Sequence, residues 1–497
     1  MATVLKINQA DNVAVAVANV AAGDICHVDG RQIKAVSDIP AGHKMALRNL
    51  QKGENVIKYG YPIGHLLEDV PEGGLIDHRI LKTNLEGVLD YKFQPIPVHV
   101  EKSVARATFK GYRRKDGQAG VRNELWVLPT VGCVNGVAEA IVRDFSRTLG
   151  SWPAIERVVA FPHNYGCSQL GDDHENTRKI LADIVHHPNA AGVLVVALGC
   201  ENNQLQAFRE LVGPVDGSRV RFMECQKIEG DEVGYGVAQL KEIAEACADD
   251  RREEIPVSEL RVGLKCGGSD GFSGITANPL LGRFSDWIVS QDGTTVLTEV
   301  PEMFGAETIL MARCANEEIF GKTVSLINDF KEYFISNRQP VYENPSPGNK
   351  AGGISTLEEK SLGCTQKSGK SAVTDVLKYG ERLRTRGLNL LSAPGNDLVA
   401  ATALAASGCQ IVLFTTGRGT PFGTFVPTAK ISTNSRIASL KPGWIDFNAG
   451  VILDGKPVAS VDDEFIDFVL SVASGEKTCN EKSSYSEIAI FKTGVTL

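Results

Sequence analysis

The stretch AGVLVVALG (191–199) decides the fold class of this chain, because it is apolar throughout and rich in branched side chains. Such a run is typical of a strand that is buried on both faces of a parallel sheet. The run ELWVLPTVG (124–132) has a similar character, and helical patterns such as HENTRKILADIVHH occur between runs of this kind. The alternation of apolar strands with helices predicts βαβ units and largely parallel sheets covered by helices.

The same alternation extends over most of the chain. Further apolar runs occur at 157–163, 219–225, 260–266, 294–300, 388–395 and 410–417. Because 497 residues are too many for one core, we divide this α/β region into two lobes, 112–255 and 256–497. Between two of the strands, residues 342–364 are rich in Gly, Pro and Ser, and we predict an irregular loop that reaches ligands.

The first part of the chain has a different pattern. Residues 1–91 contain short alternating stretches such as DNVAVAVANV, separated by turn-forming PAGHK, KGENV and PEGG. This pattern predicts a small β-rich domain. Residues 92–111 carry two prolines and little helical periodicity, so we predict a linker there.

Composition excludes several functional classes. The formal net charge is −8 and no long basic run occurs, so we expect neither a nucleic-acid nor a membrane partner. The first residues lack the features of a signal peptide and no apolar run is long enough to span a bilayer, so we expect a cytoplasmic protein. The eleven cysteines include no C-x-x-C pair, which argues against zinc ribbons and ferredoxin-type motifs.

Candidate metal ligands follow the ends of the predicted strands. Ligands of parallel α/β sheets bind beyond the carboxyl ends of the strands, and four strands here end in a cysteine beside Gly, Asn or Ser. Thiolates suit a soft-to-borderline divalent ion such as Fe²⁺. We therefore predict a metal held by Cys133, Cys167, Cys200 and Cys266. The alternative is that these cysteines fill tight spaces beside glycine turns.

Two glycine-rich segments, CGGSDGFSG (266–274) and TGRGTPFG (416–423), also follow strands. Neither has the spacing of a dinucleotide-binding or Walker A loop, so their N–H groups favour a carboxylate rather than a nucleotide. Together with the 342–364 segment they supply the predicted substrate contacts, which are Ser269, Asp270, Asn349, Lys350, Arg418 and Thr420. The alternative is that both segments are ordinary strand–helix turns.

Acid–base candidates come from the first two-fifths of the chain, because all nine histidines lie between His27 and His187. His43 and Lys44 occupy a predicted turn, and His163 follows a predicted strand. We predict that these three residues are catalytic. The alternative for a histidine on a turn is simple exposure to solvent.

The quoted segments, together with HNYGCSQLGDDH, LGCENN, TEVPEMFGAE and NPSPGNKAGGI, resemble the altronate/galactarate dehydratase family over nearly the whole chain. Within that family the likeness is greatest to the altronate-acting members. The resemblance implies an N-terminal SAF-type β domain, two α/β lobes and a divalent metal, iron or manganese. It also implies a hydro-lyase of carbohydrate catabolism that converts D-altronate, a small sugar acid, to 2-dehydro-3-deoxy-D-gluconate. A homodimer is our expectation for the assembly.

One segment departs from the family pattern. Where the SAF domain of the family carries V-H-x-H-N, this chain has Asp77 and Arg79 at the histidine positions, with His78 between them. Three alternative functions therefore stay open. They are dehydration of galactarate or another sugar acid, a related sulfo-lyase reaction, and non-catalytic binding of a sugar acid.

Overall fold

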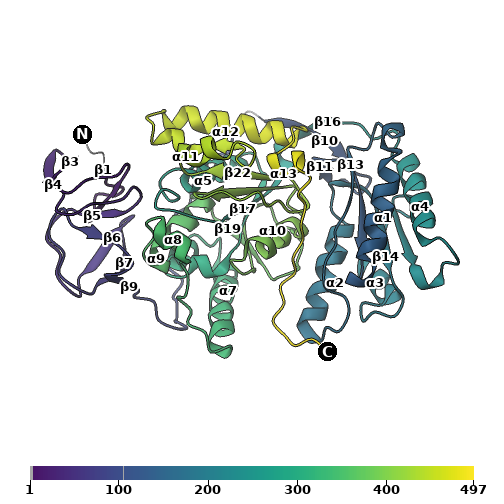
Figure 1. The fold of residues 1–497 in the computed structure, drawn as a ribbon, viewed down its shortest axis with the longest axis horizontal. Coiled ribbons are helices and arrows are strands. Elements are labelled where there is room, and N and C mark those ends of the chain that lie inside the picture. Colours follow the sequence, from purple (N-terminus) through teal and green to yellow (C-terminus); the bar gives the residue numbers. More distant parts are fainter. Residues whose placement is uncertain (1–3, 104–105) are drawn as a thin grey trace.

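The computed structural model describes residues 4–103 and 106–497. The β-rich domain lies at one end of an elongated molecule, the C-terminal α/β lobe lies in the centre, and the other lobe lies at the far end (Figure 1). In the described part of the chain, no helix is both long and apolar enough to cross a membrane.

The β-rich domain is built from short antiparallel strands. Its main sheet has the order β1-β2-β5-β8, with strands Val4–Leu5, Val13–Ala16, Lys44–Ala46 and Leu75–Ile76. A hairpin and a three-stranded sheet complete it, with strands β3 Ile25–Val28, β4 Arg31–Lys34, β6 Asn55–Lys58, β7 Tyr61–Leu66 and β9 Leu81–Lys82.

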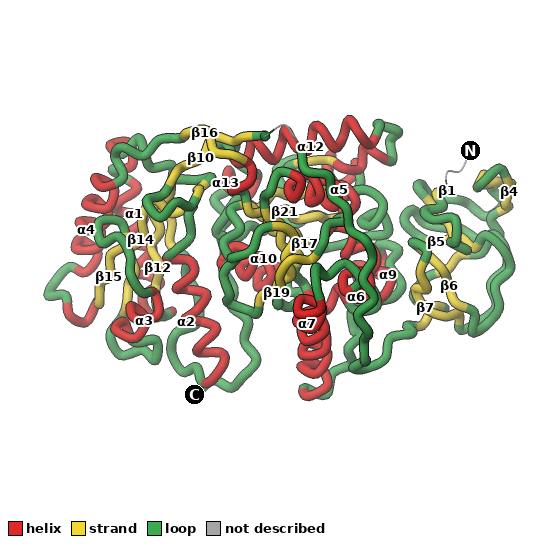
Figure 2. The backbone as a smooth tube through the Cα atoms, turned by 180° about the vertical axis from the view of Figure 1, so that it is seen from behind, coloured by secondary structure: helices red, strands yellow, loops and turns green. Residues whose placement is uncertain are grey.

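The predicted linker, 92–111, is packed against the C-terminal lobe over part of its length. The rings of Phe93 and Phe320 lie 5.2 Å apart. Strand β10 (Thr108–Arg113) begins inside the predicted linker and pairs with β11 (Ala119–Gly120) and β16 (Glu253–Pro256). Figure 2 shows β10 and β16 at the edge between the two lobes. Residues 104 and 105 of this segment lie outside the described residues.

The lobe at the far end contains a four-stranded parallel sheet of order β13-β12-β14-β15. Successive buried residues of β12 alternate between two cores, with Val127 on the side of α1 and α4, and Trp126 on the side of α2 and α3. These elements are β12 Glu124–Pro129, β13 Arg157–Ala160, β14 Ala190–Ala197, β15 Val220–Glu224, α1 Asn135–Ser146, α2 Gly171–Val185, α3 Leu205–Val212 and α4 Glu232–Ala246.

The central lobe contains a seven-stranded parallel sheet of order β19-β20-β18-β17-β21-β22-β23. Its strands are β17 Arg261–Cys266, β18 Thr294–Leu297, β19 Val373–Leu377, β20 Gly387–Leu391, β21 Ile411–Thr416, β22 Thr428–Ser432 and β23 Phe447–Asn448. Its larger helices are α5 Ala277–Ser290, α7 Glu317–Ser336, α10 Asp397–Ala406 and α12 Val458–Ala473. Both lobes thus confirm the predicted α/β class with parallel sheets.

The two lobes share an apolar core. Trp126 and Ile180 of the far lobe belong to the same cluster of buried side chains as Leu404 and Phe425 of the central lobe. Packing of this kind resists sliding, because displaced side chains would leave voids. The two sheets are therefore held in a fixed relation.

The prediction of an irregular loop at 342–364 is wrong. This segment forms two helices, α8 (Pro347–Ala351) and α9 (Leu357–Cys364), and every residue of α9 is buried. Ser346 precedes Pro347 and forms a capping box with Asn349 in the first turn of α8, and the Thr356 side chain accepts the N–H of Glu359. Caps of this type satisfy free N–H groups at the start of a helix, and they outweigh the glycine and proline content here.

Candidate functional site

Two thiols and a carboxylate meet in the interior of the central lobe. Cys266 is the last residue of β17, Cys364 is the last residue of α9, and Glu302 belongs to a 3-10 turn (Val300–Met303) after β18. The Cys266 and Cys364 sulfurs lie 3.3 Å apart, and Oε2 of Glu302 lies 3.0 Å and 3.2 Å from them. All three side chains are buried. We call this group the Cys–Glu–Cys centre.

Lysines surround this centre. The Lys367 ammonium lies 2.8 Å from the Cys266 sulfur, and Lys360 lies 2.7 Å from the Glu302 carboxylate. Burial opposes ionisation of Glu302, but the two ammonium groups outweigh it and hold its pKa at about 2. The hydrogen bond with Cys266, together with burial, raises the pKa of Cys364 well above its usual range. The centre therefore combines an ionised carboxylate with a protonated thiol.

Glu299 contacts the centre through the backbone of Cys266. The backbone of Glu299 has φ of 68°, a left-handed conformation that is uncommon for a residue with a side chain. Its carboxylate accepts the N–H of Cys266 at 2.9 Å and lies 3.2 Å from the buried ammonium of Lys265. Strained backbone of this kind persists where the surrounding structure fixes it, and such positions cluster at functional sites.

The donor set fits a divalent metal ion. Metal–thiolate bonds are about 2.3 Å long and metal–carboxylate bonds about 2.0–2.2 Å, so donors 3.0–3.3 Å apart can share one ion. In the part of the chain that the structure describes, this is the group of Cys, His and carboxylate donors whose atoms lie within 4.8 Å of one another. A protein with these contacts can hold a metal at this position.

The β-rich domain docks beside this centre. A Cβ atom on Gly271 would lie 2.0 Å from the carbonyl oxygen of Gly42, and one on Gly353 would lie 2.2 Å from it. Only glycine permits so close an approach of three backbone segments. The contact places the turn that carries His43 against the CGGSDG loop and the end of α8.

Lys44 forms an ion pair between the β-rich domain and the central lobe. Its ammonium lies 2.9 Å from Glu359 of α9, and Lys58 of β6 lies 2.7 Å from the same carboxylate. Burial opposes the charge on Glu359, but the two lysines outweigh it and hold its pKa at about 2. Because Lys44 also donates to the Gly353 carbonyl at 2.8 Å, the structure assigns it to anchoring and not to proton transfer.

His43 stays available for acid–base work. It is buried, and burial lowers its pKa, so the imidazole is neutral at pH 7. His163, in contrast, has both ring nitrogens occupied by backbone, with Nε2 2.8 Å from the Pro129 carbonyl and Nδ1 accepting the N–H of Tyr165. Burial lowers the pKa of His163 to about 4. These contacts oppose the prediction of a catalytic role for His163 and give it a structural one.

The predicted substrate contacts converge on the same region. The Asn349 amide donates to the Ser269 carbonyl at 2.8 Å, and its oxygen lies 3.3 Å from the Lys360 ammonium. The guanidinium of Arg418 donates to the Gly348 carbonyl at 3.3 Å. A cavity of about 10 Å³, room for about one water, touches Ser269, Lys360 and Cys364. The Ser269 hydroxyl is buried beside this cavity without a hydrogen-bond partner.

The other predicted contacts have different surroundings. The Asp270 carboxylate accepts from Thr433 at 2.9 Å and from Asn434 at 3.0 Å, so it joins loops and is not free for substrate. Lys350 is half-buried in α8. The Thr420 hydroxyl accepts the N–H of Phe422 at 3.3 Å. Substrate roles for Lys350 and Thr420 stay predictions.

The predicted four-cysteine metal site does not form. Cys266 is buried in the central lobe, whereas Cys133, Cys167 and Cys200 are exposed at the sheet of the other lobe. These cysteines follow strands of two different sheets, and the ends of strands in separate sheets do not converge on one ion. Sequence reasoning missed Cys364, Lys360 and Lys367, which lie in or beside the segment assigned to a loop. Glu302 was visible as a carboxylate after a strand.

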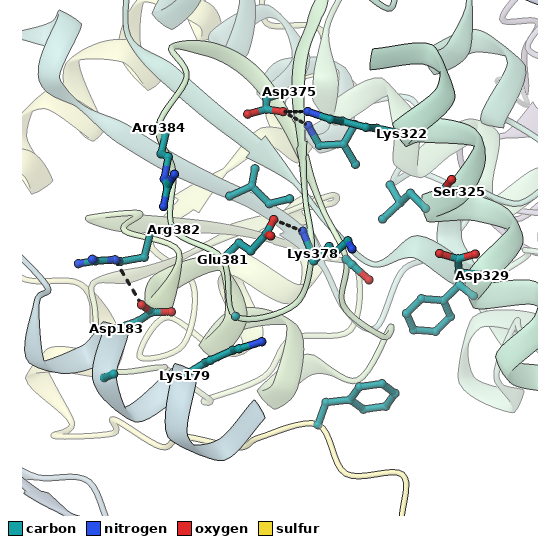
Figure 3. A pocket seen from close by; sticks show the side chains of 18 of the residues that line it. Lys179, Asp183, Lys322, Ser325, Asp329, Asp375, Lys378, Glu381, Arg382 and Arg384 are labelled. Carbon is teal, nitrogen blue, oxygen red and sulfur yellow. Dashed lines mark hydrogen bonds and ion pairs between the residues drawn. The ribbon is translucent and has the colours of Figure 1, made fainter. Parts of the chain in front are cut away.

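A large cavity lies away from the Cys–Glu–Cys centre. It has a volume of about 890 Å³ and opens between α2, α7 and the edge strand β19 (Figure 3). Its charged side chains occur with both signs, and Arg382 pairs with Asp183 at 3.4 Å. Burial raises the pKa of Asp183 to about 8. Residues of α2 in the far lobe and of α7 in the central lobe line this cavity, so it lies at the boundary between the lobes. No residue of the Cys–Glu–Cys centre lines it.

Comparisons with known proteins agree over the full length of the chain. Residues 2–84 match the altronate/galactarate dehydratase SAF domain, 111–248 the second domain of D-galactarate dehydratase/altronate hydrolase, and 257–496 the C-terminal domain of D-galactarate/altronate dehydratase. Altronate dehydratase of Bacillus subtilis (strain 168) is 58% identical over 100% of both chains, and that of Escherichia coli (strain K12) is 55% identical over 99% of both. Galactarate dehydratase (L-threo-forming) of Escherichia coli is 34% identical over 98% of this chain and 96% of its own.

Proposed function

This chain belongs to the D-galactarate/altronate dehydratase family, and we propose that it is a hydro-lyase that converts D-altronate to 2-dehydro-3-deoxy-D-gluconate at the Cys–Glu–Cys centre. The observation that carries the substrate is the identity of 55% and 58% with two altronate dehydratases over essentially whole chains. The galactarate-acting relative is 34% identical, so galactarate is a weaker candidate.

We infer that the metal is iron rather than manganese. Metal binding would displace the thiol protons of Cys266 and Cys364. The two thiolates so formed are a soft ligand set, which suits Fe²⁺ better than Mn²⁺, an ion that prefers oxygen donors. Cys266, Cys364 and Glu302 would hold it. When bound, such an ion polarises a carboxylate or hydroxyl oxygen of the substrate.

The reaction needs a base for the proton on C2 and an acid for the departing hydroxyl on C3. We assign the base to His43, because burial keeps its imidazole neutral and the β-rich domain brings it to the domain junction. We assign the acid to Lys360, whose pKa is raised by the Glu302 carboxylate against the effect of burial. A lysine that stays protonated can donate a proton to a leaving hydroxide.

Arg418 is our candidate for the substrate carboxylate. Within residues 4–103 and 106–497, its guanidinium makes one hydrogen bond, to the Gly348 carbonyl, which leaves donors for a two-point contact with a carboxylate. Lys350 of the neighbouring helix α8 adds a second positive charge. A ligand bound by Arg418 would lie beside α8, whose Asn349 is hydrogen-bonded to the Ser269 carbonyl.

The test is an anaerobic assay of the purified chain loaded with Fe²⁺. We expect a 2-keto-3-deoxy acid from D-altronate at a higher kcat/KM than from galactarate, and no sulfite from sulfolactate. Cys409→Ser is the matched control for cysteine loss, because Cys409 is buried in the shared core away from the centre. A higher kcat/KM with galactarate, or release of sulfite from sulfolactate, would contradict the proposed dehydration of D-altronate. Stabilisation of the chain by a sugar acid without turnover would support the alternative of a non-catalytic sugar-acid-binding protein.

A homodimer and a cytoplasmic location are proposals of the same kind. Light scattering of the purified chain tests the first, and fractionation of cells that express it tests the second.

A further inference from the structure

Three exposed thiols gather at one end of the far lobe. Cys133, Cys167 and Cys200, which we call the cysteine triad, follow strands β12, β13 and β14. These strands are direct neighbours in the sheet order β13-β12-β14. The N–H of Leu497 donates to the Ser168 carbonyl, so the triad lies near the chain end marked C in Figure 1.

Hydrogen bonds join the three loops that carry the triad. The Gly132 N–H donates to the Tyr165 carbonyl at 3.0 Å, and the Asn203 N–H donates to the Gly166 carbonyl at 3.0 Å. The Ser168 N–H donates to the Asn202 side chain at 2.7 Å. Each cysteine of the triad thus lies within three residues of a position that is hydrogen-bonded to the loop of another triad cysteine. The three thiols are held on one small surface.

Close backbone contact tightens the same surface. A Cβ atom on Gly166, which has φ of +96°, would lie 2.1 Å from the Thr130 carbonyl oxygen. A Cβ atom on Gly132 would lie 2.7 Å from the His163 carbonyl oxygen. No other residue type fits at these positions without moving the loops apart.

A helix begins just after each member of the triad. Helix α1 begins at Asn135 after Cys133, α2 at Gly171 after Cys167, and α3 at Leu205 after Cys200. The partial positive charge of a helix N-terminus favours bound anions. Three such termini together favour an anionic group shared by the three sulfurs.

The spacing of the triad does not suit one metal ion. In the described residues, no set of three donors that includes a triad sulfur lies within 4.8 Å of one another, unlike the donors of the Cys–Glu–Cys centre. A polynuclear cluster spans a wider set of thiolates than a single ion does. Iron–sulfur clusters are held by cysteine thiolates, and hydrogen bonds to those sulfurs tune them. Here the Gln226 amide donates to the Cys200 sulfur at 3.6 Å.

We propose that the cysteine triad binds a [4Fe–4S] cluster through three thiolates. Each thiol loses its proton and coordinates one iron. The fourth iron then has no protein thiolate and takes an oxygen ligand, such as water or the carboxylate and hydroxyl of a small hydroxy acid. This assignment is independent of the reaction proposed for the Cys–Glu–Cys centre, because it concerns other residues in another lobe.

Cys225 is the internal control. It follows β15, the next strand in the same sheet, but its side chain packs against the core beneath α1 and α4. Burial raises its pKa to about 11. Cys225 therefore has the same place in the topology without the exposure of the triad.

The test is anaerobic reconstitution of the full chain with sulfide and equal amounts of ferrous and ferric iron, because a [4Fe–4S]2+ cluster contains two irons of each oxidation state. We expect about four iron and four acid-labile sulfide per chain, together with the broad visible absorption of an iron–sulfur cluster. Cys133→Ser, Cys167→Ser and Cys200→Ser should each lose the absorption, while Cys225→Ala keeps it. Iron bound without sulfide, or a cluster that survives all three serine variants, would overturn the proposal.

Alkylation of the wild-type chain gives a second measurement that requires no variant. Iodoacetamide should label the triad before reconstitution and not after it, as mapped by mass spectrometry, whereas exposed lysines report unchanged reactivity toward an amine reagent. Equal labelling of the triad before and after reconstitution would overturn the proposal. Neither measurement uses turnover, so failure of the altronate assay does not affect the result.

Discussion

Replacement of Glu359 by Gln tests whether a buried charge group fastens the β-rich domain to the central lobe. Lys44 and Lys58 come from β5 and β6, and both bind the Glu359 carboxylate of α9, with side chains no more than 1% exposed. The variant leaves two buried ammonium groups without their anion. Removal of one partner from a buried ion pair costs about 3–5 kcal/mol, and we expect a loss of that size at pH 7.

The pKa of Glu359 gives a second value for the same contact. Its fall from the ordinary 4.5 to about 2 corresponds to about 3 kcal/mol of stability, at 1.36 kcal/mol per pKa unit. Because the pKa is lower in the folded state, this stability is fully present above pH 4.5. It is lost as the pH falls through about 2.

The assay is urea unfolding at a series of pH values, followed by fluorescence and by proteolysis within residues 83–107. Wild type should lose stability between pH 4.5 and 2, and Glu359→Gln should start lower and show a flatter profile over that range. Glu343→Gln, which alters an exposed carboxylate near the same helix pair, should match wild type. A Glu359→Gln protein within about 1 kcal/mol of wild type at pH 7 would refute the reasoning, because that is the range of an exposed ion pair.

Three further predictions concern the site. His43→Ala should lower kcat by about 10²–10⁴-fold with little change in KM, whereas His78→Ala should leave kcat unchanged. Because burial lowers the pKa of His43, the wild-type rate should fall only at pH values below those at which histidine ordinarily gains its proton. An unchanged kcat would remove His43 from the chemistry. Arg418→Met should raise KM for altronate with a smaller effect on kcat, measured by steady-state kinetics, and an unchanged KM would place the carboxylate elsewhere. Free Fe²⁺ at about 100 times its Kd should stabilise wild type by about 2.7 kcal/mol and Cys364→Ser by much less, as measured by thermal unfolding with and without a chelator. Equal stabilisation of both proteins would mean that Cys364 is not a ligand.

Most strands of the two sheets could be predicted because their apolar runs are local, whereas β19, β22 and β23 of the central lobe were not predicted. The buried segments at 124–132 and 191–199 became β12 and β14. The helices at 347–351 and 357–364 could not be predicted from composition, although the Ser346-Pro347 pair and the Thr356 cap carry the signal. The high glycine and proline content of this segment indicated a loop, although both helices begin at capping residues.

The centre itself depends on contacts between distant residues. Cys266 and Cys364 are far apart in sequence but meet at 3.3 Å, and nothing local to either residue indicates the other. Lys360 and Lys367 look like ordinary surface charges in the sequence, yet both are buried against acidic or thiol partners. Pairing of this kind is a property of the fold.

Asp77 and Arg79 form an ion pair with each other. The Arg79 guanidinium donates to the Asp77 carboxylate at 2.9 Å, and Asp77 is buried while Arg79 is exposed. Asp77 also raises the pKa of His43 against the larger effect of burial. An ion pair therefore occupies the positions where the family resemblance led us to expect histidines, next to the imidazole that we assign to proton transfer.

The most direct test of the account is turnover of D-altronate by wild type and by Cys364→Ser, each purified without oxygen and supplied with Fe²⁺. We predict formation of the 2-keto-3-deoxy acid by wild type and by the Cys409→Ser control, and a loss of activity together with bound iron in Cys364→Ser. Full activity in Cys364→Ser would contradict the assignment of the reaction to the Cys–Glu–Cys centre.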